Sequence, residues 1–544
     1  MKLVTVSEMR AVEAEADKNG LSYEKMMGNA GWGLANEIEQ LAYSENEKQK
    51  VLGLVGTGNN GGDTLVALAQ LASDGWSSRA YLIRRQSTAD GLVDELRKQG
   101  GEVIFAEGDP QFEQLSAFVN SADVVVDGIL GTGFQSPLRE DVAAVMDAVN
   151  KTIAERSWPP YVVAVDCPSG VNCDTGESAE EAIPASLTVC MAAVKTGLLK
   201  FPAYDLVGEL RVVEIGLNDE WPTWKNINRF VADNEYVEDV LPLRPADSHK
   251  GTYGTALVTA GSINYVGAPL LAGKAAYRIG AGLVQLAVPG QVQLAIAGQF
   301  PEATWIILPQ EMGVISENAS EVLMKNLSRA TALLVGPGLG TEETTRNFIE
   351  NLLDRKMVSG KPSGRIGFTQ MESEKQVEAS ASLPMMVVDA DGLRLLAKIK
   401  NWHQLLPALA VLTPHPGEMA ALTGLEKEVI QADRLAIAVK YAAEWGHVIV
   451  LKGAFTIIAA PDGRASLIPV ATPALARAGT GDVLAGIITG LRAQGVGAYE
   501  AAVAGAWIHA QAGLYAAEKV GSDASVMAGD VLDAIADVMS GFSL

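Results

Sequence analysis

The sequence predicts an α/β protein of two domains, each built on a mainly parallel sheet. Short apolar runs alternate with amphipathic stretches from Val51 to Asp166 and again from Thr255 to Gly453, as in repeated strand-helix units. The chain has 544 residues, of which 48% are hydrophobic but only 6% aromatic, and 55 are glycine. This size excludes a single small module. The high glycine and low aromatic content favours α/β enzymes, with many tight turns between strands and helices, over β-sandwiches.

The first domain is expected over residues 1–225, and its first element is expected to be a helix. Thr5 and Glu8 have capping-box spacing, and Met9, Val12 and Ala16 follow at helical intervals. Strands are expected at 51–55 (VLGLV), 79–83 (RAYLI), 124–128 (VVVDG) and 161–166 (YVVAVD), with helices at 63–72, 91–98 and 142–149. This winding predicts a Rossmann-like domain of three layers, with the sheet between two layers of helices.

The second domain is expected over residues 240–544. Periodicity is lost between Asp219 and Lys250, where Trp, Pro, Asn and charged residues are mixed, so the boundary is expected there. Strands are then expected at 255–261 (TALVTAG), 283–290 (LVQLAVPG), 332–338 (ALLVGPG), 385–392 (MMVVDADG), 410–417 (AVLTPHPG) and 448–453 (VIVLKG). Two or three long alanine-rich helices are expected from Gly479, and the polar stretch 355–383 is expected to be an excursion from this domain.

Charge and cysteine content exclude several classes of partner. With 42 basic and 65 acidic residues the net charge is −23, which disfavours binding of nucleic acid through a basic surface. The three cysteines lack the paired spacing of a disulfide framework or a zinc site. The N-terminus has acidic residues where a signal peptide needs an apolar core, and no apolar stretch reaches membrane-spanning length. We expect a cytoplasmic protein that binds neither nucleic acid nor membranes, and we expect a homo-oligomer.

Three segments of the first domain carry residues suited to ligand binding. They are GTGNNGGD at 56–63, DGILGTG at 127–133 and DCPSG at 166–170, and each follows an expected strand. Glycines let the backbone approach a ligand, and free N–H groups at a helix N-terminus bind phosphate. Open α/β sheets collect ligands at the carboxyl ends of their strands, so the three segments are expected to meet there. The alternative for the first segment is a plain tight turn, because it matches neither GxGxxG nor the P-loop pattern.

The combination of NNGGD with the later DCPSG resembles the NAD(P)H-hydrate epimerases, over roughly residues 1–216. The resemblance implies that this domain binds a hydrated nicotinamide nucleotide (NADHX or NADPHX) and that oxygens of Asn60, Asp127 and Ser169 bind K⁺. The residues implied to line the nucleotide site are Asn59, Asn60, Gly61, Gly62, Asp63, Gly131, Thr132, Gly133, Phe134, Gln135, Ser136, Pro137 and Asp166. Members commonly have Gly after NNGGD, where this chain has Thr64, so the geometry of this loop is left open.

Asp166 is the candidate catalytic residue of the first domain. Interconversion of the two C6 epimers requires proton transfer, and a carboxylate at the end of a strand can serve as the acid or base. The alternative is that Asp166 only caps the Pro-Ser-Gly turn that follows it.

The densest motif of the second domain is AGTGDVLAG at 478–486, before an apolar helix. Its glycines expose backbone donors at the helix N-terminus and place the Asp482 carboxylate beside a bound phosphate. The loop resembles the anion hole of ribokinase-like proteins, in which the matching aspartate deprotonates the hydroxyl that attacks a phosphoryl group. Taken alone, the motif indicates a small-molecule kinase.

Further segments in order refine this resemblance to the ADP-dependent NAD(P)H-hydrate dehydratases, over about residues 241–544. They are SHKGTYG (248–254), Gly261-Ser262 with Gly267-Ala268, GPGLG (336–340), DADG (389–392), TPHPGE (413–418) and Lys452-Gly453. The resemblance implies a ribokinase-like α/β fold, ADP as co-substrate and Mg²⁺ as cofactor. It implies that the C6 hydroxyl of (S)-NAD(P)HX is phosphorylated and that phosphate then leaves, with AMP as co-product.

The same resemblance assigns roles to residues of the second domain. Asp482 is implied to be the general base, and backbone N–H groups of Gly479–Gly481 to stabilise the transferred phosphoryl group. Residues implied to bind ADP or AMP are Lys452, Gly453, Ala454, Phe455, Thr456, Gly479, Thr480 and Gly481. Residues implied to contact the hydrated nicotinamide nucleotide are Ala268, Gly340, His415 and Asp482.

Several residues of the second domain keep two interpretations. His415 either contacts the ligand or fixes a turn between its flanking prolines. Asp389 and Asp391 either support Mg²⁺ and the active site or cap a turn, and His249 with Lys250 form either part of the site or a basic loop.

The two resemblances together predict a bifunctional repair enzyme, in which one domain equilibrates the epimers and the other dehydrates the S form. One alternative is a ribokinase-like small-molecule kinase with a non-catalytic nucleotide-binding N-terminal domain. Another is a first domain that binds a nucleotide or protein only as a sensor or scaffold.

Overall fold

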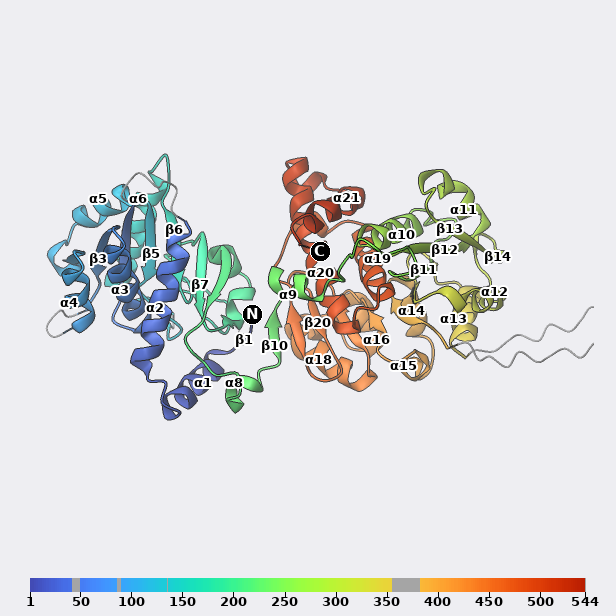
Figure 1. Ribbon diagram of the computed structural model, residues 1–544, viewed down its shortest axis with the longest axis horizontal. Helices are drawn as coiled ribbons and strands as arrows, with labels where there is room; N and C mark the ends of the chain where they lie inside the picture. Colours follow the sequence, from blue (N-terminus) through green and yellow to red (C-terminus); the bar gives the residue numbers. More distant parts are fainter. Residues whose placement is uncertain (42–48, 86–89, 135, 355–381, 544) are drawn as a thin grey trace, which may run out of the picture. The chain divides into compact units, whose positions relative to one another are not determined.

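The computed structural model describes residues 1–41, 49–85, 90–134, 136–354 and 382–543 (Figure 1). They divide into two compact units, Met1–Val231 and Ala232–Leu544, called here the first and second units. The division falls inside the stretch 219–250 that lacks periodicity. Both units are α/β with parallel sheets, which confirms the predicted fold class. The polar stretch 355–381 lies outside the described residues.

The first unit is built on a seven-stranded sheet with the order β4-β3-β2-β5-β6-β7-β9, in which all neighbours are parallel. Its strands are β2 (Lys50–Val55), β3 (Ser77–Leu82), β4 (Glu102–Phe105), β5 (Val124–Gly128), β6 (Tyr161–Val165), β7 (Leu187–Met191) and β9 (Glu209–Val213). The chain moves from β2 to β3 and β4, and then resumes at β5 on the other side of β2. The neighbouring carboxyl ends of β2 and β5 are therefore a switch point, where such sheets open to a ligand.

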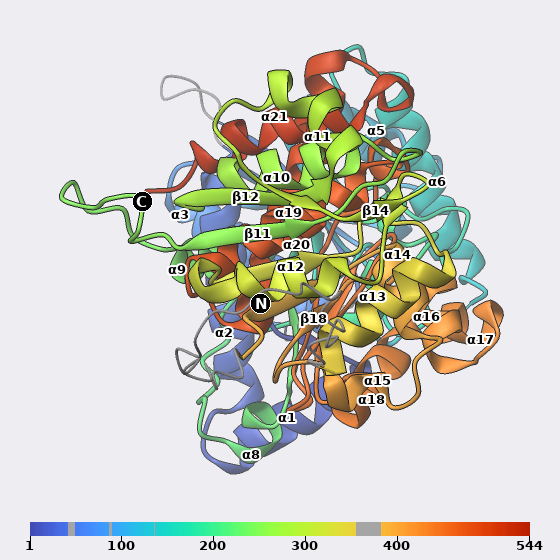
Figure 2. The same cartoon turned by 90° about the vertical axis from the view of Figure 1, so that its right-hand side faces the viewer.

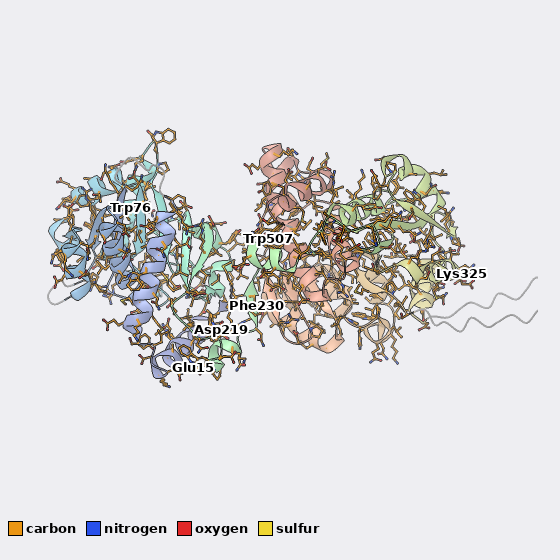
Figure 3. The ribbon with its side chains drawn as sticks, viewed as in Figure 1. Glu15, Trp76, Asp219, Phe230, Lys325 and Trp507 are labelled. Atoms are coloured by element: carbon orange, nitrogen blue, oxygen red, sulfur yellow. The ribbon has the colours of Figure 1, made fainter. Side chains whose placement is uncertain are left out.

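Helices cover both faces of this sheet. One apolar core lies under α1 (Val6–Lys18), α2 (Tyr23–Glu39), α3 (Asn59–Ser73) and α4 (Gly91–Lys98), and it includes the buried Trp76 (Figure 3). The other lies under α5 (Glu113–Ser121) and α6 (Glu140–Ala154). The capping box of Thr5 and Glu8 is confirmed at the start of α1. The remaining elements are β1 (Leu3–Val4), β8 (Val194–Lys195), α7 (Tyr204–Val207), α8 (Pro222–Lys225) and β10 (Arg229–Val231).

The helix after β2 begins earlier than the sequence predicts. We expected it at Asp63, but α3 starts at Asn59, so the NNGGD segment forms the first turn of the helix instead of a loop before it. Gly61 explains why the helix can start so close to the strand. A Cβ atom on Gly61 would lie 2.1 Å from the carbonyl oxygen of Gly56.

The sheet of the second unit has the order β21-β20-β19-β18-β17-β16-β11-β12-β13. Its strands are β11 (Thr255–Thr259), β12 (Leu283–Pro289), β13 (Thr304–Leu308), β16 (Ala332–Val335), β17 (Met385–Val388), β18 (Val411–Leu412), β19 (Val448–Leu451), β20 (Ile457–Ala459) and β21 (Ala465–Leu467). All six expected strands are present and parallel to one another, while β20 pairs antiparallel with β19 and β21 antiparallel with β20. A small antiparallel pair, β14 (Gln310–Glu311) with β15 (Val314–Ile315), was not anticipated.

Four helices pack together on one face of this sheet: α10 (Ala268–Arg278), α19 (Thr480–Ala493), α20 (Ala498–Val520) and α21 (Ala528–Met539) (Figure 2). The last three are the alanine-rich helices expected from Gly479. Connections from β13 to β16 and on to β17 run back along the sheet, and right-handed crossovers therefore place α12 (Ala319–Lys325) and α13 (Glu343–Asp354) on the other face. The remaining helices are α9 (Asn234–Val240), α11 (Gly290–Ile296), α14 (Asp391–Leu396), α15 (Trp402–Leu405), α16 (Pro416–Thr423), α17 (Lys427–Ala432) and α18 (Arg434–Trp445).

Glycines on α19 let it approach α10 closely. A Cβ on Gly486 would lie 2.2 Å from the carbonyl oxygen of Ala272, and a Cβ on Gly490 would lie 2.7 Å from that of Ala276. These pairs are each four residues apart, so the two helices run in the same direction. One turn earlier, the same register brings Ala268 alongside Asp482, which joins two predicted site residues that are far apart in the sequence.

We expect Gly486→Ala to destabilise the second unit by about 1–3 kcal/mol, because the added methyl group forces two packed helices apart. Urea unfolding of the full chain measures this change. Gly529→Ala on α21 is the matched control, since nothing lies within 4 Å of its added Cβ, and there alanine should be neutral or slightly stabilising. Equal stability of the two variants would contradict the close approach of α10 and α19.

Candidate active sites

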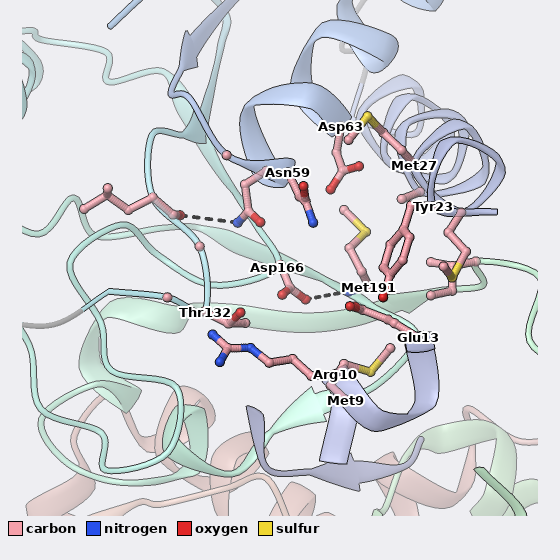
Figure 4. A pocket seen from close by; sticks show the side chains of 18 of the residues that line it. Met9, Arg10, Glu13, Tyr23, Met27, Asn59, Asp63, Thr132, Asp166 and Met191 are labelled. Carbon is pink, nitrogen blue, oxygen red and sulfur yellow. Dashed lines mark hydrogen bonds between the residues drawn. The ribbon is translucent and has the colours of Figure 1, made fainter. Parts of the chain in front are cut away.

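A cavity of about 920 Å³ lies in the first unit at the carboxyl ends of β2, β5 and β6 (Figure 4). All three predicted segments contribute to its wall, and the predicted residues that line it are Asn59, Asn60, Asp63, Gly131, Thr132, Gly133, Phe134 and Asp166. Helices α1 and α2 supply another part of the wall, including Arg10, Glu13 and Tyr23, which sequence reasoning missed. Gly61, Gly62, Ser136 and Pro137 are not among its lining residues, and Gln135 lies outside the described residues.

Asp166 is held at the end of β6 by the backbone and by a buried lysine. Its φ is +64°, a left-handed value that is uncommon for a non-glycine residue. Its Oδ1 accepts hydrogen bonds from the Met191 N–H, at 2.9 Å, and from the Lys195 ammonium. Lys195 also donates to the carbonyls of Met191 and Ala193, at 3.0 Å each. Lys195 is 1% exposed, and the parallel pairing of β8 with β1 places it there.

Lys195 interacts electrostatically with the carboxyl groups of Asp166, Asp63 and Glu13. Burial lowers the pKa of Lys195, but the charge and hydrogen bond of Asp166 together with Cys190 and Cys173 raise it, to about 12. Burial raises the pKa of the Asp63 carboxyl well above its ordinary value, and the charges of Asp166 and Glu13 raise it further. Burial and Asp166 also raise the pKa of Glu13, against the effect of Lys195. The cavity therefore combines a charged pair with carboxyl groups that favour the protonated state.

The predicted cation ligands form an oxygen-rich cluster beside the cavity. Asp127 is fully buried, and its carboxylate accepts from the Ser169 hydroxyl, at 2.6 Å, and from the Ser169 N–H, at 2.7 Å. The Asn60 amide donates to the carbonyls of Leu130, at 3.3 Å, and Val165. Burial raises the pKa of Asp127, and the hydrogen bonds that lower it come from neutral groups of Ser169 and Ile129. A buried carboxylate among hydroxyl, amide and carbonyl oxygens suits a hard monovalent cation, so the donor set fits K⁺.

Thr64, whose effect on the loop the sequence leaves open, lies within α3. Its side chain is buried, and its hydroxyl donates to the carbonyl of Asn60 at 2.7 Å, one turn back along α3. A Cβ on Gly128 would lie 2.0 Å from the Thr64 hydroxyl oxygen, so the missing side chain at Gly128 makes room for Thr64.

In the second unit, Asp482 lies in the first turn of α19, where Gly479 is the N-cap with a φ of +91°. Burial raises the pKa of the Asp482 carboxyl to about 7, with a further increase from the charge of Asp389 and an opposing effect of Lys452. A Cβ on Gly481 would lie 3.5 Å from the Lys452 Nζ, which shows that this lysine reaches the glycine loop.

Asp389 and Asp391 bind neighbouring segments of the site. The Asp389 carboxylate accepts from the Lys452 ammonium and from the Thr413 hydroxyl, at 2.7 Å each. Asp391 accepts from the Gly340 N–H at 3.0 Å. These contacts link the residues after β17 to the segments that contain Gly340, Thr413 and Lys452. Of the two interpretations, the structure therefore favours support of the site over turn capping.

His415 caps a helix with its imidazole. Its Nδ1 accepts from the N–H groups of Gly417, at 2.9 Å, and Glu418, at 3.3 Å, at the start of α16. Its Nε2 lies 3.3 Å from the Glu418 carboxylate, and the side chain is 44% exposed. Turn fixation is therefore observed, and the exposed part of the ring can still meet a ligand.

A partly buried arginine holds the predicted ADP segment 452–456. Arg434, at the start of α18, donates to the carbonyls of Leu451, at 2.9 Å, Lys452, at 3.2 Å, and Ala454. The segment needs this support because Gly453 and Phe455 both have positive φ. Sequence reasoning missed Arg434, since no motif marks it and it lies 17 residues before Leu451, the residue that precedes the segment.

Comparisons with known proteins show the family of this chain. A family profile described as "YjeF-related protein N-terminus" matches residues 23–197, and one described as "NAD(P)H-hydrate dehydratase" matches residues 256–358 and 368–536. The bifunctional NAD(P)H-hydrate repair enzyme Nnr of Moorella thermoacetica is 36% identical, over 98% of this chain and 96% of that protein. The chain belongs to the family of bifunctional NAD(P)H-hydrate repair enzymes. The resemblance read from the motifs is thereby confirmed.

Other members of the family and solved structures are also similar. The repair enzyme Nnr of Escherichia coli K12 is 32% identical, over 95% of this chain and 90% of that protein. The crystal structure of an ADP/ATP-dependent NAD(P)H-hydrate dehydratase from Bacillus subtilis, co-crystallized with ATP and Mg²⁺, is 30% identical and covers 58% of this chain and 100% of its own, with a TM-score of 0.46.

Two features of this family member follow from the structure alone. Helix α1, with Arg10 and Glu13, precedes the matched residues 23–197 and yet lines the cavity. Among the residues that the structure describes, no helix has the length and apolar character needed to cross a membrane.

Proposed function

We propose that the first unit interconverts the R and S epimers of NADHX and NADPHX, and that the second unit dehydrates the S epimer with ADP, releasing AMP and phosphate. The observation that carries the proposal is that each unit places a carboxyl group beside a glycine-rich helix N-terminus, the buried Asp63 on α3 and the partly buried Asp482 on α19. Membership of the repair family supports it. Local donors such as these N–H groups and Lys452 bind anionic nucleotides despite the net charge of −23.

In the first unit, Asp166 is the acid or base at C6, and the cavity holds the hydrated ring. The residues proposed to surround the nucleotide are Asn59, Asn60, Gly61, Gly62, Asp63, Gly131, Thr132, Gly133, Phe134, Gln135, Ser136 and Pro137. The structure supports a direct role for those that line the cavity. The positions of Gly61 and Gly62 favour an indirect role, in which the missing side chains allow close packing. A Cβ on Gly62 would lie 2.6 Å from the Met27 side chain, and a Cβ on Gly61 would lie 2.1 Å from the carbonyl oxygen of Gly56.

K⁺ would be held beside this cavity by Asn60, Asp127 and Ser169, and it would supply positive charge near a bound phosphate. We expect K⁺ to raise the melting temperature of the first unit relative to an equal concentration of tetramethylammonium, because it binds only the folded state. Ser169→Ala should remove most of that difference. Equal melting temperatures in K⁺ and in tetramethylammonium would refute the site.

In the second unit, Asp482 takes the proton of the C6 hydroxyl as that oxygen attacks the terminal phosphoryl group of ADP. The segment 452–456 (Lys452, Gly453, Ala454, Phe455 and Thr456) holds the nucleotide, and the N–H groups of Gly479, Thr480 and Gly481 stabilise the transferred phosphoryl group. Ala268, Gly340 and His415 contact the hydrated nicotinamide. The carboxylates of Asp389 and Asp391 are hard oxygen donors that suit Mg²⁺, which supplies positive charge to the phosphates when bound.

We expect the kcat/KM of dehydration to rise with pH through a midpoint near 7. The general base must be ionised, and burial raises the pKa of Asp482 to about 7, so activity is lost as the pH falls below that value. Asp391→Asn removes one of the negative charges that raise this pKa, and it should move the midpoint to lower pH. A flat profile between pH 6 and 8 would argue against Asp482 as the base.

The decisive assay mixes both epimers with the full chain, ADP and Mg²⁺ and follows the absorbance of the reduced nicotinamide. Complete recovery of that absorbance supports both activities. Recovery that stops at the S fraction removes the epimerase proposal. A stable phosphorylated product without AMP release would favour the small-molecule kinase instead.

A further inference from the structure

Two carboxyl groups enter the cavity of the first unit from different elements. Asp63 projects from α3 and Asp166 from the end of β6, and their side chains point into the cavity from opposite sides (Figure 4). Asp63 is 6% exposed, and among the described residues no hydrogen-bond donor contacts its carboxyl group. Because this carboxyl group lines the cavity and accepts no hydrogen bond from the described residues, it is free to contact a ligand there.

The surroundings of these two carboxyl groups differ. Asp166 contacts the buried ammonium group of Lys195. Asp63 and Glu13 have no such contact, and burial raises the pKa of both. Arg10, the remaining charged group on the α1 side, is exposed. One carboxyl group can therefore give a proton while the other can take one.

The chemistry of epimerisation at C6 requires two such groups. The R and S epimers differ only in the face of the ring that carries the hydroxyl group. A proton must reach the hydroxyl that leaves one face, and a proton must be taken from the water that adds to the other. A single carboxyl group at the end of β6 can serve only the face that it meets.

We propose that Asp63 is the second catalytic residue of the epimerase, and that it donates a proton to the departing C6 hydroxyl while Asp166 accepts one from water on the opposite face. The C6–O bond breaks and its electron pair leaves with the new water molecule, while the lone pair of N1 forms an N1=C6 double bond. A second water molecule adds to C6 from the other face, and the N1=C6 electron pair returns to N1. The proton lost by this water goes to Asp166, so atoms and charge balance, and the reverse states of the two carboxyl groups catalyse the return reaction.

This inference rests on the proposed epimerase activity and makes a separate prediction about oxygen. Each inversion should exchange the C6 oxygen with solvent, so one ¹⁸O atom should enter the product per inversion in H₂¹⁸O after the enzyme-free rate is subtracted. Epimerisation without ¹⁸O would overturn the inference but leave the proposed function intact. Absence of epimerisation in the unaltered chain would instead refute the proposed function.

The residue itself is tested by Asp63→Asn, which we expect to lower the kcat of epimerisation by about 10²-fold or more. Asp94→Asn, an exposed carboxyl group on α4, is the matched control and should leave the rate unchanged. Dehydration of the S epimer by the same sample reports the concentration of intact protein. An unchanged epimerisation rate in Asp63→Asn would overturn the inference.

Asp63→Glu keeps the test decisive if the asparagine variant fails to fold. It retains an acid, displaced by one methylene group, and should show a reduced kcat with one ¹⁸O atom still incorporated per inversion. Complete loss of epimerisation in a folded Asp63→Glu variant, or inversion without label, would refute the role of Asp63 as proton donor.

Discussion

Asp482→Asn is expected to reduce the kcat of ADP-dependent dehydration by about 10³-fold while epimerisation in the same chain continues at its normal rate. The amide cannot accept the proton of the C6 hydroxyl, and general-base catalysis of this kind contributes about 10² to 10⁴-fold. The nearly isosteric substitution also keeps the first turn of α19 intact, so the glycine loop should still bind nucleotide.

Two measurements on one sample make this expectation sharp. The dehydration of pure S epimer gives the activity of the second unit, and the R-to-S exchange gives that of the first. A nucleotide-binding titration should show an affinity for ADP within a few-fold of the unaltered chain. Dehydration within tenfold of normal would show that Asp482 is not the base, and loss of ADP binding would show that its role is structural.

Lys195→Met is expected to destabilise the first unit by about 3–5 kcal/mol. The substitution leaves the buried carboxylate of Asp166 without its cation, and removal of one partner of a buried ion pair has a cost of this size. It also leaves the carbonyls of Met191 and Ala193 without the donors that they have in the native chain. Chemical unfolding of the full chain, followed by epimerase activity, measures the change.

The double variant Asp166→Asn with Lys195→Met separates the ion pair from simple packing. With both charges removed, most of the lost stability should return, although epimerisation should remain abolished. Dehydration by the second unit should be unaffected in both variants. A double variant that is as unstable as Lys195→Met alone would show that the lysine acts through its packing and not through its charge.

The elements that the sequence predicted well are those whose signal is local. Strands such as Val124–Gly128 can be recognised from consecutive apolar residues, here three valines. A parallel sheet that is covered on both faces does not require polar residues at alternate positions. The glycine loops are equally visible, since a helix that starts directly at a strand end tolerates no side chain at positions such as Gly61. The start of α3 was nevertheless misplaced by four residues, because two asparagines and two glycines read as a loop until the chain folds them against Gly56 and Gly128.

The residues that sequence reasoning missed act through contacts between distant segments. Lys195 lies in a two-residue strand with no motif, and its ion pair exists only because β8 and the end of β6 meet in the folded unit. Glu13 lies on an ordinary amphipathic helix and enters the cavity only because α1 packs across it. Arg434 is likewise one basic residue at the start of a helix, and only folding brings its guanidinium group to two carbonyls of the ADP segment and to that of the preceding Leu451.

The sequence by itself therefore determined the fold class, the two-part organisation and the family, through motifs in which neighbouring residues carry the whole signal. Only the tertiary structure decided how the carboxyl groups are poised. Asp166 meets Lys195, Asp63 meets no donor among the described residues, and the partly buried Asp482 is affected by the charge of Asp389. The physical reason is that a carboxyl group's proton affinity depends on its burial and on the charges around it, and both are created when segments far apart in the chain pack together.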